Sequence, residues 1–152
     1  MGMSVRSYRK KLDTTKYKEG ICRVGFFESS KYEGGKTVAS VAAANEFGVP
    51  KDSGERIPPR PFMRPAIHQN KTQLIETLRS KYRQALKDNE DTMKVLNDFG
   101  IKVQGLIQEQ IINTWEPPNA PSTIKKKGLN APLRDTRVML HSVQHQEEEI
   151  RK

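Results

Sequence analysis

The loop before the first predicted helix has the residue types of a phosphate site. Gly35-Lys36-Thr37 stands ahead of that helix, as the end of a phosphate-binding loop does. That motif also needs a glycine five residues before Gly35, where this chain has Ser30. A glycine turn followed by a threonine N-cap accounts for the same residues, so the sequence predicts no nucleotide site here.

Histidine and cysteine side chains offer metal or nucleophile chemistry. His141 and His145 are four residues apart and would share one face of a helix, but no glutamate lies between them and no third ligand is in register. Cys22 falls in a predicted strand, which favours a small core residue, and His68 is distant from it in the sequence. No Gly-x-Ser-x-Gly elbow occurs either. We therefore predict no catalytic residue, no metal ligand and no cofactor, so that the protein is not an enzyme.

Composition limits the class of protein. The chain has 152 residues, which suggests one domain, with 34% hydrophobic and 30% charged residues. Such a polar composition indicates exposed arms or loops around a modest core. No apolar run is long enough for a transmembrane helix, and the basic N-terminus lacks a secretory apolar segment. The single cysteine excludes an internal disulfide and a zinc cluster, and favours assembly in a reducing, intracellular compartment.

The net charge of +9 is concentrated at the two ends of the chain. Residues 1–36 carry a net +5 and residues 117–152 a net +3, whereas residues 69–116 sum to zero. The basic groups singled out are an arm and a late loop: Arg6, Arg9, Lys10 and Lys11, then Lys125, Lys126 and Lys127. They could neutralise phosphates, dock on an acidic protein, or form only a solvated surface.

The first half of the chain predicts an arm, a strand and a short helix. Residues 1–18 show no regular spacing of apolar residues and are expected to form a basic arm. Residues 20–27 are β-branched and aromatic, which favours a strand. Residues 38–47 predict a helix capped by Thr37 and ended by Gly48.

Two longer helices are expected in the middle. Apolar residues recur every four positions in residues 67–87, at Leu74, Leu78, Tyr82 and Leu86. A second helix is expected over residues 91–115, with an apolar face at Leu96, Phe99, Val103, Leu106, Ile107, Ile111 and Trp115. Gly100 and Gly105 lie inside it, and their helix-weakening effect suggests that close packing requires them.

The last part predicts a loop at 119–134 with one helical turn at 122–125, a turn at 138–140, a strand at 142–144 and a polar tail at 146–152. Together these elements predict an α+β fold, a small, mostly antiparallel sheet packed with two longer helices. The expected division is an arm (1–18), one α+β domain (19–145) and a polar tail (146–152). A sheet of two or three short strands is marginal alone, so oligomerisation is expected to complete it.

Four segments together resemble a known family. They are Val24–Phe27, the series Val38–Gly48 that ends in Asn-Glu-Phe-Gly, the segment Ile57–Ala66 (IPPRPFMRPA), and Ala131–Ser142 with its Pro-Leu-x-Asp-Thr. Their order and spacing are similar to the virion-morphogenesis, tail-completion or neck proteins of tailed bacteriophages, often labelled minor tail proteins. The resemblance covers residues 20–145. Arg137 departs from it, because the family usually has glycine there, and a glycine with positive φ would leave arginine strained.

The resemblance implies a structural role in the virion, after assembly in the host cytoplasm. Such proteins form homo-oligomeric rings, here expected as a hexamer or a multiple of one, at the junction of head and tail. Their partners are the connector on the portal side and the tail terminator or tail tube, with DNA in the channel and no membrane. The family is not known for catalysis.

The expected contact residues follow from this role. The stiff segment Ile57–Ala66 is expected to be an inter-subunit clasp, in which Arg60 and Arg64 pair with acids such as Glu46 of the same or a neighbouring subunit. Phe62 would anchor this segment on a core. The basic arm, the basic loop and Arg137 would dock on neighbouring proteins or line the DNA channel. The alternative function is a basic nucleic-acid-binding module, which steep salt dependence would reveal.

Overall fold

The computed structural model describes residues 13–50, 52, 57–128, 130, 132–133 and 137–150, without the side chains of Lys126 and Lys127. The chain folds as a small α+β protein with a two-stranded antiparallel sheet, which confirms the predicted class. The elements in chain order are η1 (Thr14–Lys16), β1 (Gly20–Phe26), α1 (Val38–Phe47), α2 (Met63–Asp88), α3 (Thr92–Asn113), α4 (Pro121–Lys127), α5 (Val138–His141) and β2 (Val143–Glu149).

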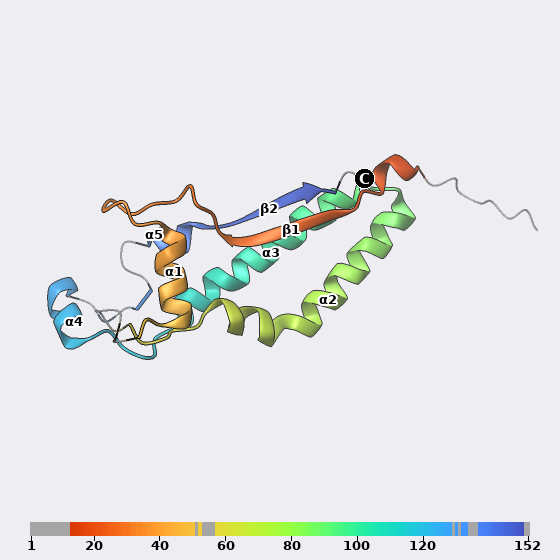
Figure 1. Ribbon diagram of the computed structural model, residues 1–152. Helices are drawn as coiled ribbons and strands as arrows, with labels where there is room; N and C mark the ends of the chain where they lie inside the picture. Colours follow the sequence, from red (N-terminus) through yellow and green to blue (C-terminus); the bar gives the residue numbers. More distant parts are fainter. Residues whose placement is uncertain are drawn as a thin grey trace, which may run out of the picture.

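The two long helices form an antiparallel pair, and the sheet lies along α3 (Figure 1). The turn between the helices is short because Asn89 takes the left-handed conformation and ends α2, while the Asp91 side chain accepts from the Met93 N–H and starts α3. The small elements α1, α4 and α5 gather at the other end of the pair (Figure 1). The molecule is thus elongated, and one cluster of buried hydrophobic side chains lies towards the end that carries α1 and α5 (Figure 1).

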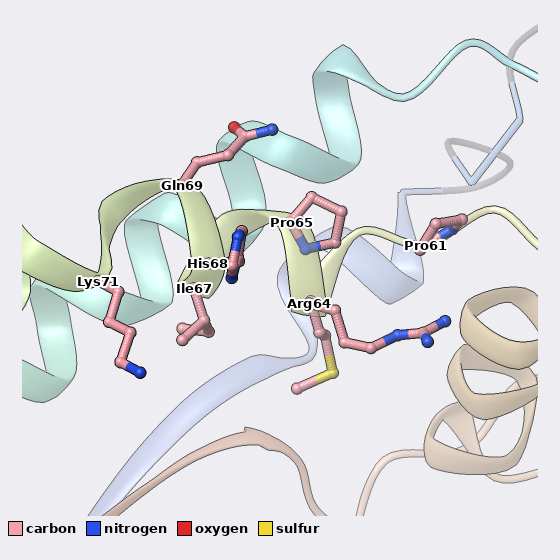
Figure 2. A pocket seen from close by; sticks show the side chains of 8 residues that line it. Pro61, Arg64, Pro65, Ile67, His68, Gln69 and Lys71 are labelled. Atoms are coloured by element: carbon pink, nitrogen blue, oxygen red, sulfur yellow. The ribbon is translucent and has the colours of Figure 1, made fainter.

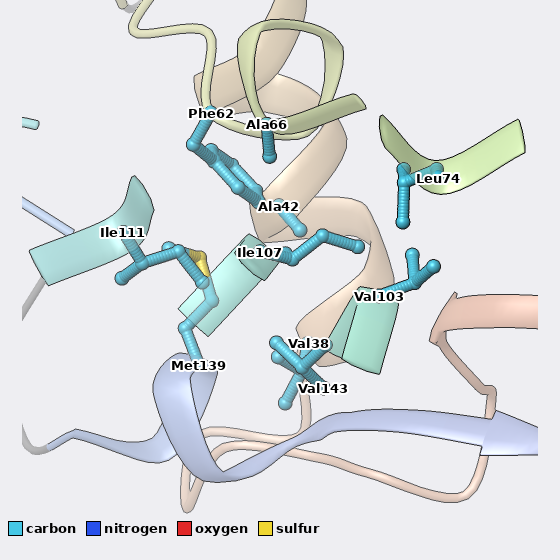
Figure 3. Close-up of a cluster of buried hydrophobic side chains, with 10 residues drawn as sticks. All are labelled: Val38, Ala42, Phe62, Ala66, Leu74, Val103, Ile107, Ile111, Met139 and Val143. Carbon is cyan, nitrogen blue, oxygen red and sulfur yellow. The ribbon is translucent and has the colours of Figure 1, made fainter. Parts of the chain in front are cut away.

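That core is where α1, α2, α3, α5 and β2 meet (Figure 3). Phe62 and Ile107 are fully buried, and the Phe62 ring stands edge-on to Phe26 of β1, with centroids 6.0 Å apart. The cluster consists of Val38, Ala42, Phe62, Ala66, Leu74, Val103, Ile107, Ile111, Met139 and Val143. Segments from all of the resemblance-bearing motifs therefore pack together.

The end of β2 corrects the expected polar tail. Residues Gln146–Glu149 are not a tail but the second half of β2, paired with Gly20–Arg23 of β1. This half carries no apolar pattern; the strand ladder pairs it with β1, and two solvent-accessible ion pairs, Lys18–Glu149 and Arg23–Glu148, add little to its stability. Neither the ladder hydrogen bonds nor these ion pairs produce a hydrophobic period in the sequence.

The start of the described chain also differs from a simple arm. Residues Thr14–Lys16 form a 3₁₀ turn, η1, whose Asp13 side chain caps it. The Asp13 N–H donates to Asn89 Oδ1, and the Lys18 N–H donates to Thr92 Oγ1. The last part of the expected arm is thereby fastened to the turn between α2 and α3. Arg6, Arg9, Lys10 and Lys11 lie outside the described residues.

The two glycines of α3 have different surroundings. A Cβ on Gly100 would stand 2.7 Å from His145 Cδ2 and 2.8 Å from Cys22 Sγ, so this glycine lets the sheet approach the helix. A Cβ on Gly105 would meet nothing within 4 Å. The expectation of close packing is confirmed at Gly100 and wrong at Gly105. Helix α3 also ends at Asn113, which leaves Trp115 beyond it and half exposed.

Candidate interaction site

Glu46 joins the end of α1 to the start of α2. Its side chain is only 3% exposed, and Oε2 accepts from the N–H groups of Phe62 (2.7 Å) and Met63 (2.9 Å). Oε1 accepts from the Arg64 N–H (3.1 Å) and from Arg64 Nε (2.8 Å). One carboxylate therefore accepts hydrogen bonds from three N–H groups at the start of α2 that have no partner within the helix. Its negative charge also interacts favourably with the positive end of the α2 dipole.

Burial on its own would raise the pKa of the Glu46 carboxyl. The hydrogen bonds from the Phe62 N–H, the Arg64 guanidinium and the N–H groups of Met63 and Arg64 outweigh burial, so the net pKa is lowered. Glu46 is thus ionised at neutral pH.

Arg64 completes this junction from the solvent side. Its Nη2 donates to the Glu46 carbonyl oxygen at 2.8 Å, and its guanidinium lies 4.9 Å from the centre of the exposed Phe47 ring. The expected pairing of Arg64 with Glu46 therefore occurs within one chain. The outer faces of Arg64 and Phe47 are exposed beside each other.

Arg60 has a different role from the one expected. Arg60 is 7% exposed and, within the described part of the chain, has no acid at ion-pair distance; Nε donates to the Pro117 carbonyl at 2.6 Å and Nη2 to the Pro118 carbonyl at 2.9 Å. Burial lowers the pKa of the Arg60 guanidinium, which stays charged because its pKa begins so high. Arg60 thus holds the segment after α3 against the segment before α2. Phe62 anchors the same segment on the core, as expected.

The junction lies beside an open, mostly apolar hollow of about 900 Å³ at the start of α2. Figure 2 shows Ile67 and Lys71 pointing from α2 towards the side where the strands run, whereas Gln69 points to the opposite side. We call it the α2 hollow; it is lined by Pro61, Met63, Arg64, Pro65, Ile67, His68, Gln69 and Lys71.

A second hollow of about 320 Å³ adjoins it through Met63. We call it the β1-edge hollow; it is lined by residues 23–27 of β1 and its continuation, Ala39, Ala42, Ala43 and Phe47 of α1, and Met63. Consecutive residues of a strand point to alternate faces, so a hollow that touches five in a row runs along the strand edge.

The remaining predicted contact residues are spread over the molecule. Lys125 is exposed on α4, seven residues long, and the side chains of Lys126 and Lys127 lie outside the described part. Arg137 precedes α5 with φ 57°, the left-handed conformation that the family glycine would adopt without strain. Among the described side chains, neither Lys125 nor Arg137 hydrogen-bonds to the Glu46–Arg64 junction.

The net charge of α2 is not visible when charges are summed over the longer segment 69–116. Residues 69–116 sum to zero, yet α2 itself carries six lysines and arginines against two acids. The compensating acids lie mostly in the turn after α2 and in α3. The net charge of each predicted helix, summed separately, would have indicated that α2 is basic.

His145 is a half-buried residue whose contacts the sequence did not predict. Its Nδ1 lies 2.7 Å from Gln104 Oε1 and its Nε2 lies 3.0 Å from Asn97 Oδ1, both on α3. It therefore fastens β2 to α3. His141 lies on a different element, α5, so the two histidines do not share a helix face. Cys22 is a residue of β1. Burial and the nearby Glu147 charge raise the pKa of its thiol.

Within the described ranges, no three His, Cys, Asp or Glu side chains gather closely enough to hold a metal ion. None of the described helices is both long and apolar enough to cross a membrane. Comparison with known proteins gives no match to a family model, to a curated protein or to a solved structure.

Proposed function

We propose that the chain is a structural subunit of the head–tail junction of a tailed bacteriophage, a neck or tail-completion protein. It assembles as a homo-oligomeric ring that joins the connector to the tail terminator or tail tube. The polypeptide acts by packing and surface complementarity and performs no catalysis. Its place of action is the virion.

The observation that carries this proposal is the convergence of the resemblance-bearing segments. Glu46, from the Asn-Glu-Phe-Gly segment, binds the backbone and side chain of the Arg-Pro-Phe-Met-Arg segment. Met139, from the last segment, is buried in the same core as Phe62. Segments far apart in the chain thus form one structural unit, which supports reading them together rather than as separate chance similarities.

Incomplete burial also favours an assembling subunit. The sheet has two strands in the described chain, and a sheet of this size is marginal without further packing. Large apolar side chains are exposed on several elements, among them Phe47, Ile101, Ile112 and Trp115. A ring that repeats one heterologous contact would cover such surfaces on every subunit.

A nucleic-acid-binding module is the second candidate, and the basic surface of α2 favours it. Apart from Arg64, which pairs with Glu46, five cationic side chains on this helix could neutralise phosphates along a duplex. In a ring, the same helix would instead face the DNA channel or an acidic neighbour.

The mass of the purified chain in solution separates the two functions. Light scattering with gel filtration at low and high salt should give one ring-sized oligomer, and electron microscopy of that peak should show a central opening. A monomer at every concentration that binds DNA with a steep salt dependence would contradict the ring and favour the nucleic-acid module.

A further inference from the structure

Figure 1 shows β1 on the α2 side of β2, and no described strand pairs with the outer edge of β1. The Ile150 N–H donates to the Glu19 carbonyl at 2.8 Å, so Glu19 and every second residue after it direct their backbone groups to β2. The backbone N–H and C=O groups of Cys22, Val24 and Phe26 therefore point away from β2. Among the described residues they have no strand partner.

The helix layer is wider than the sheet that it carries. Neighbouring strands are about 4.8 Å apart and packed helices about 8–10 Å apart, so a pair of helices spans about four strands. The described residues supply two, and both lie on α3. Among the described residues, no strand packs on α2.

The flank of α2 on the side of β1 is apolar and basic. Met63, Ile67, Ile75 and Leu78 follow one another on it at helical spacing, and Ile75 is 39% exposed. At the start of α2 this flank lines the α2 hollow, and Met63 connects it to the β1-edge hollow. Lys71 belongs to the same flank and, within the described part of the chain, has no acid at ion-pair distance.

We infer that the groove between the free edge of β1 and this flank of α2 binds an extended, acidic and apolar segment of another protein, which adds a strand to the sheet. Backbone groups of Cys22, Val24 and Phe26 would pair with the incoming strand. Its apolar side chains would lie on Ile67 and Ile75, and its carboxylates would meet Lys71. This inference rests on the groove alone and stands whether or not the chain forms a ring.

Other occupants fit less well. The strand β2 of a second copy already has α3 against its inner face, so it could not lie over α2 as well. The chain's own residues 1–12 carry four cations and no acid, which Lys71 would repel. A separate acidic strand meets neither obstacle.

The test measures backbone amide exchange by NMR while a blocked ten-residue peptide of alternating valine and glutamate is added. We expect the N–H groups of Cys22, Val24 and Phe26 to exchange more slowly, and those of Ile21 and Arg23, already in the ladder, to change little. An alternating valine–lysine peptide and a valine–glutamate peptide with a central proline serve as controls, since the first reverses the charge and the second cannot pair.

Two substitutions of matched exposure locate the site. Ile75→Asp, on the groove flank, should weaken binding of the valine–glutamate peptide at least about tenfold, because it buries or repels a charge. Ile112→Asp, at a position 41% exposed near the end of α3, should leave binding unchanged. No binding up to about 1 mM, equal binding of the lysine peptide, or binding without protection of the three amides would overturn the inference.

Discussion

The carboxylate of Glu46, in the last turn of α1, forms an ion pair of 2.8 Å with Nε of Arg64, in the first turn of α2. The same carboxylate accepts three backbone N–H groups and thereby takes the place of a local N-cap residue. One buried charge thus links the end of a short helix to the start of a long one. Arg64 also returns a hydrogen bond to the Glu46 carbonyl, which ties the two helix ends in both directions.

Replacing this charge should destabilise the fold. Glu46→Gln keeps an acceptor oxygen but loses the charge that several donors share, so we expect unfolding free energy to fall by about 1–3 kcal/mol. Urea unfolding followed by circular dichroism measures the change. Glu76→Gln, on the exposed side of α2, is the matched control and should stay within about 0.5 kcal/mol of the wild type. Equal effects of the two would refute a special role for Glu46.

Stability should also depend on pH through Glu46. Because folding lowers the pKa of this carboxyl, its contribution is fully present above the unfolded pKa of about 4.3 and is lost as pH falls through the folded value. Unfolding free energy should therefore drop with acidification below about pH 5, and less steeply in Glu46→Gln. The pKa of Asp13 is also lowered, by hydrogen bonds from Thr15, so Asp13→Asn is the comparison that separates the two groups. A slope that is the same in wild type and Glu46→Gln would contradict the assignment.

The two glycines of α3 should respond in opposite ways to alanine. Gly100→Ala places a methyl group within 3 Å of Cys22 and His145, and should cost about 1–3 kcal/mol by forcing the sheet from the helix. Gly105→Ala fills open space and should gain up to about 1 kcal/mol from helix propensity. Thermal unfolding of both variants measures these changes in stability. A Gly105→Ala variant that is less stable than the wild type would contradict the open surroundings of Gly105.

Arg137 stands in the left-handed conformation before α5. Arg137→Gly removes a steric cost of about 1–2 kcal/mol and adds some unfolded-state entropy, so a net gain of about 0.5–1 kcal/mol is expected. Ser40→Gly, in α1, tests the opposite case and should lose about 0.5–1 kcal/mol. If both variants lose stability, the conformation at Arg137 is not strained.

Local signals sufficed where an element is stabilised by its own residues. Thr37 accepts from the Ser40 N–H and Gly48 ends α1 with φ 77°, so both limits of this helix are confirmed. Helix α2 begins at Met63 rather than near Ile67, because its cap, Glu46, comes from another helix. Pro65 in its first turn needs no N–H partner and is compatible with that start.

Long-range contacts explain the other differences. The acidic half of β2 has no apolar alternation, and its pairing with β1 depends on residues more than a hundred positions away. Glu46 was expected to pair with Arg60 and Arg64, in the same or a neighbouring subunit, as part of the clasp that the resemblance implies; the pair that forms within this chain is Glu46 with Arg64. The carbonyls that bind Arg60 could not be found in this way, since backbone groups of Pro117 and Pro118 carry no signal in side-chain type.

If the proposed role is right, a tailed bacteriophage encodes the chain, and the most direct test is to locate the chain in the virions of that phage. Purified virions would be labelled with a gold-conjugated antibody raised against the chain and viewed by electron microscopy. A neck or tail-completion subunit predicts label concentrated where head meets tail. Virions that carry no label, while the protein is abundant in the infected cells that produced them, would contradict a structural role in the virion.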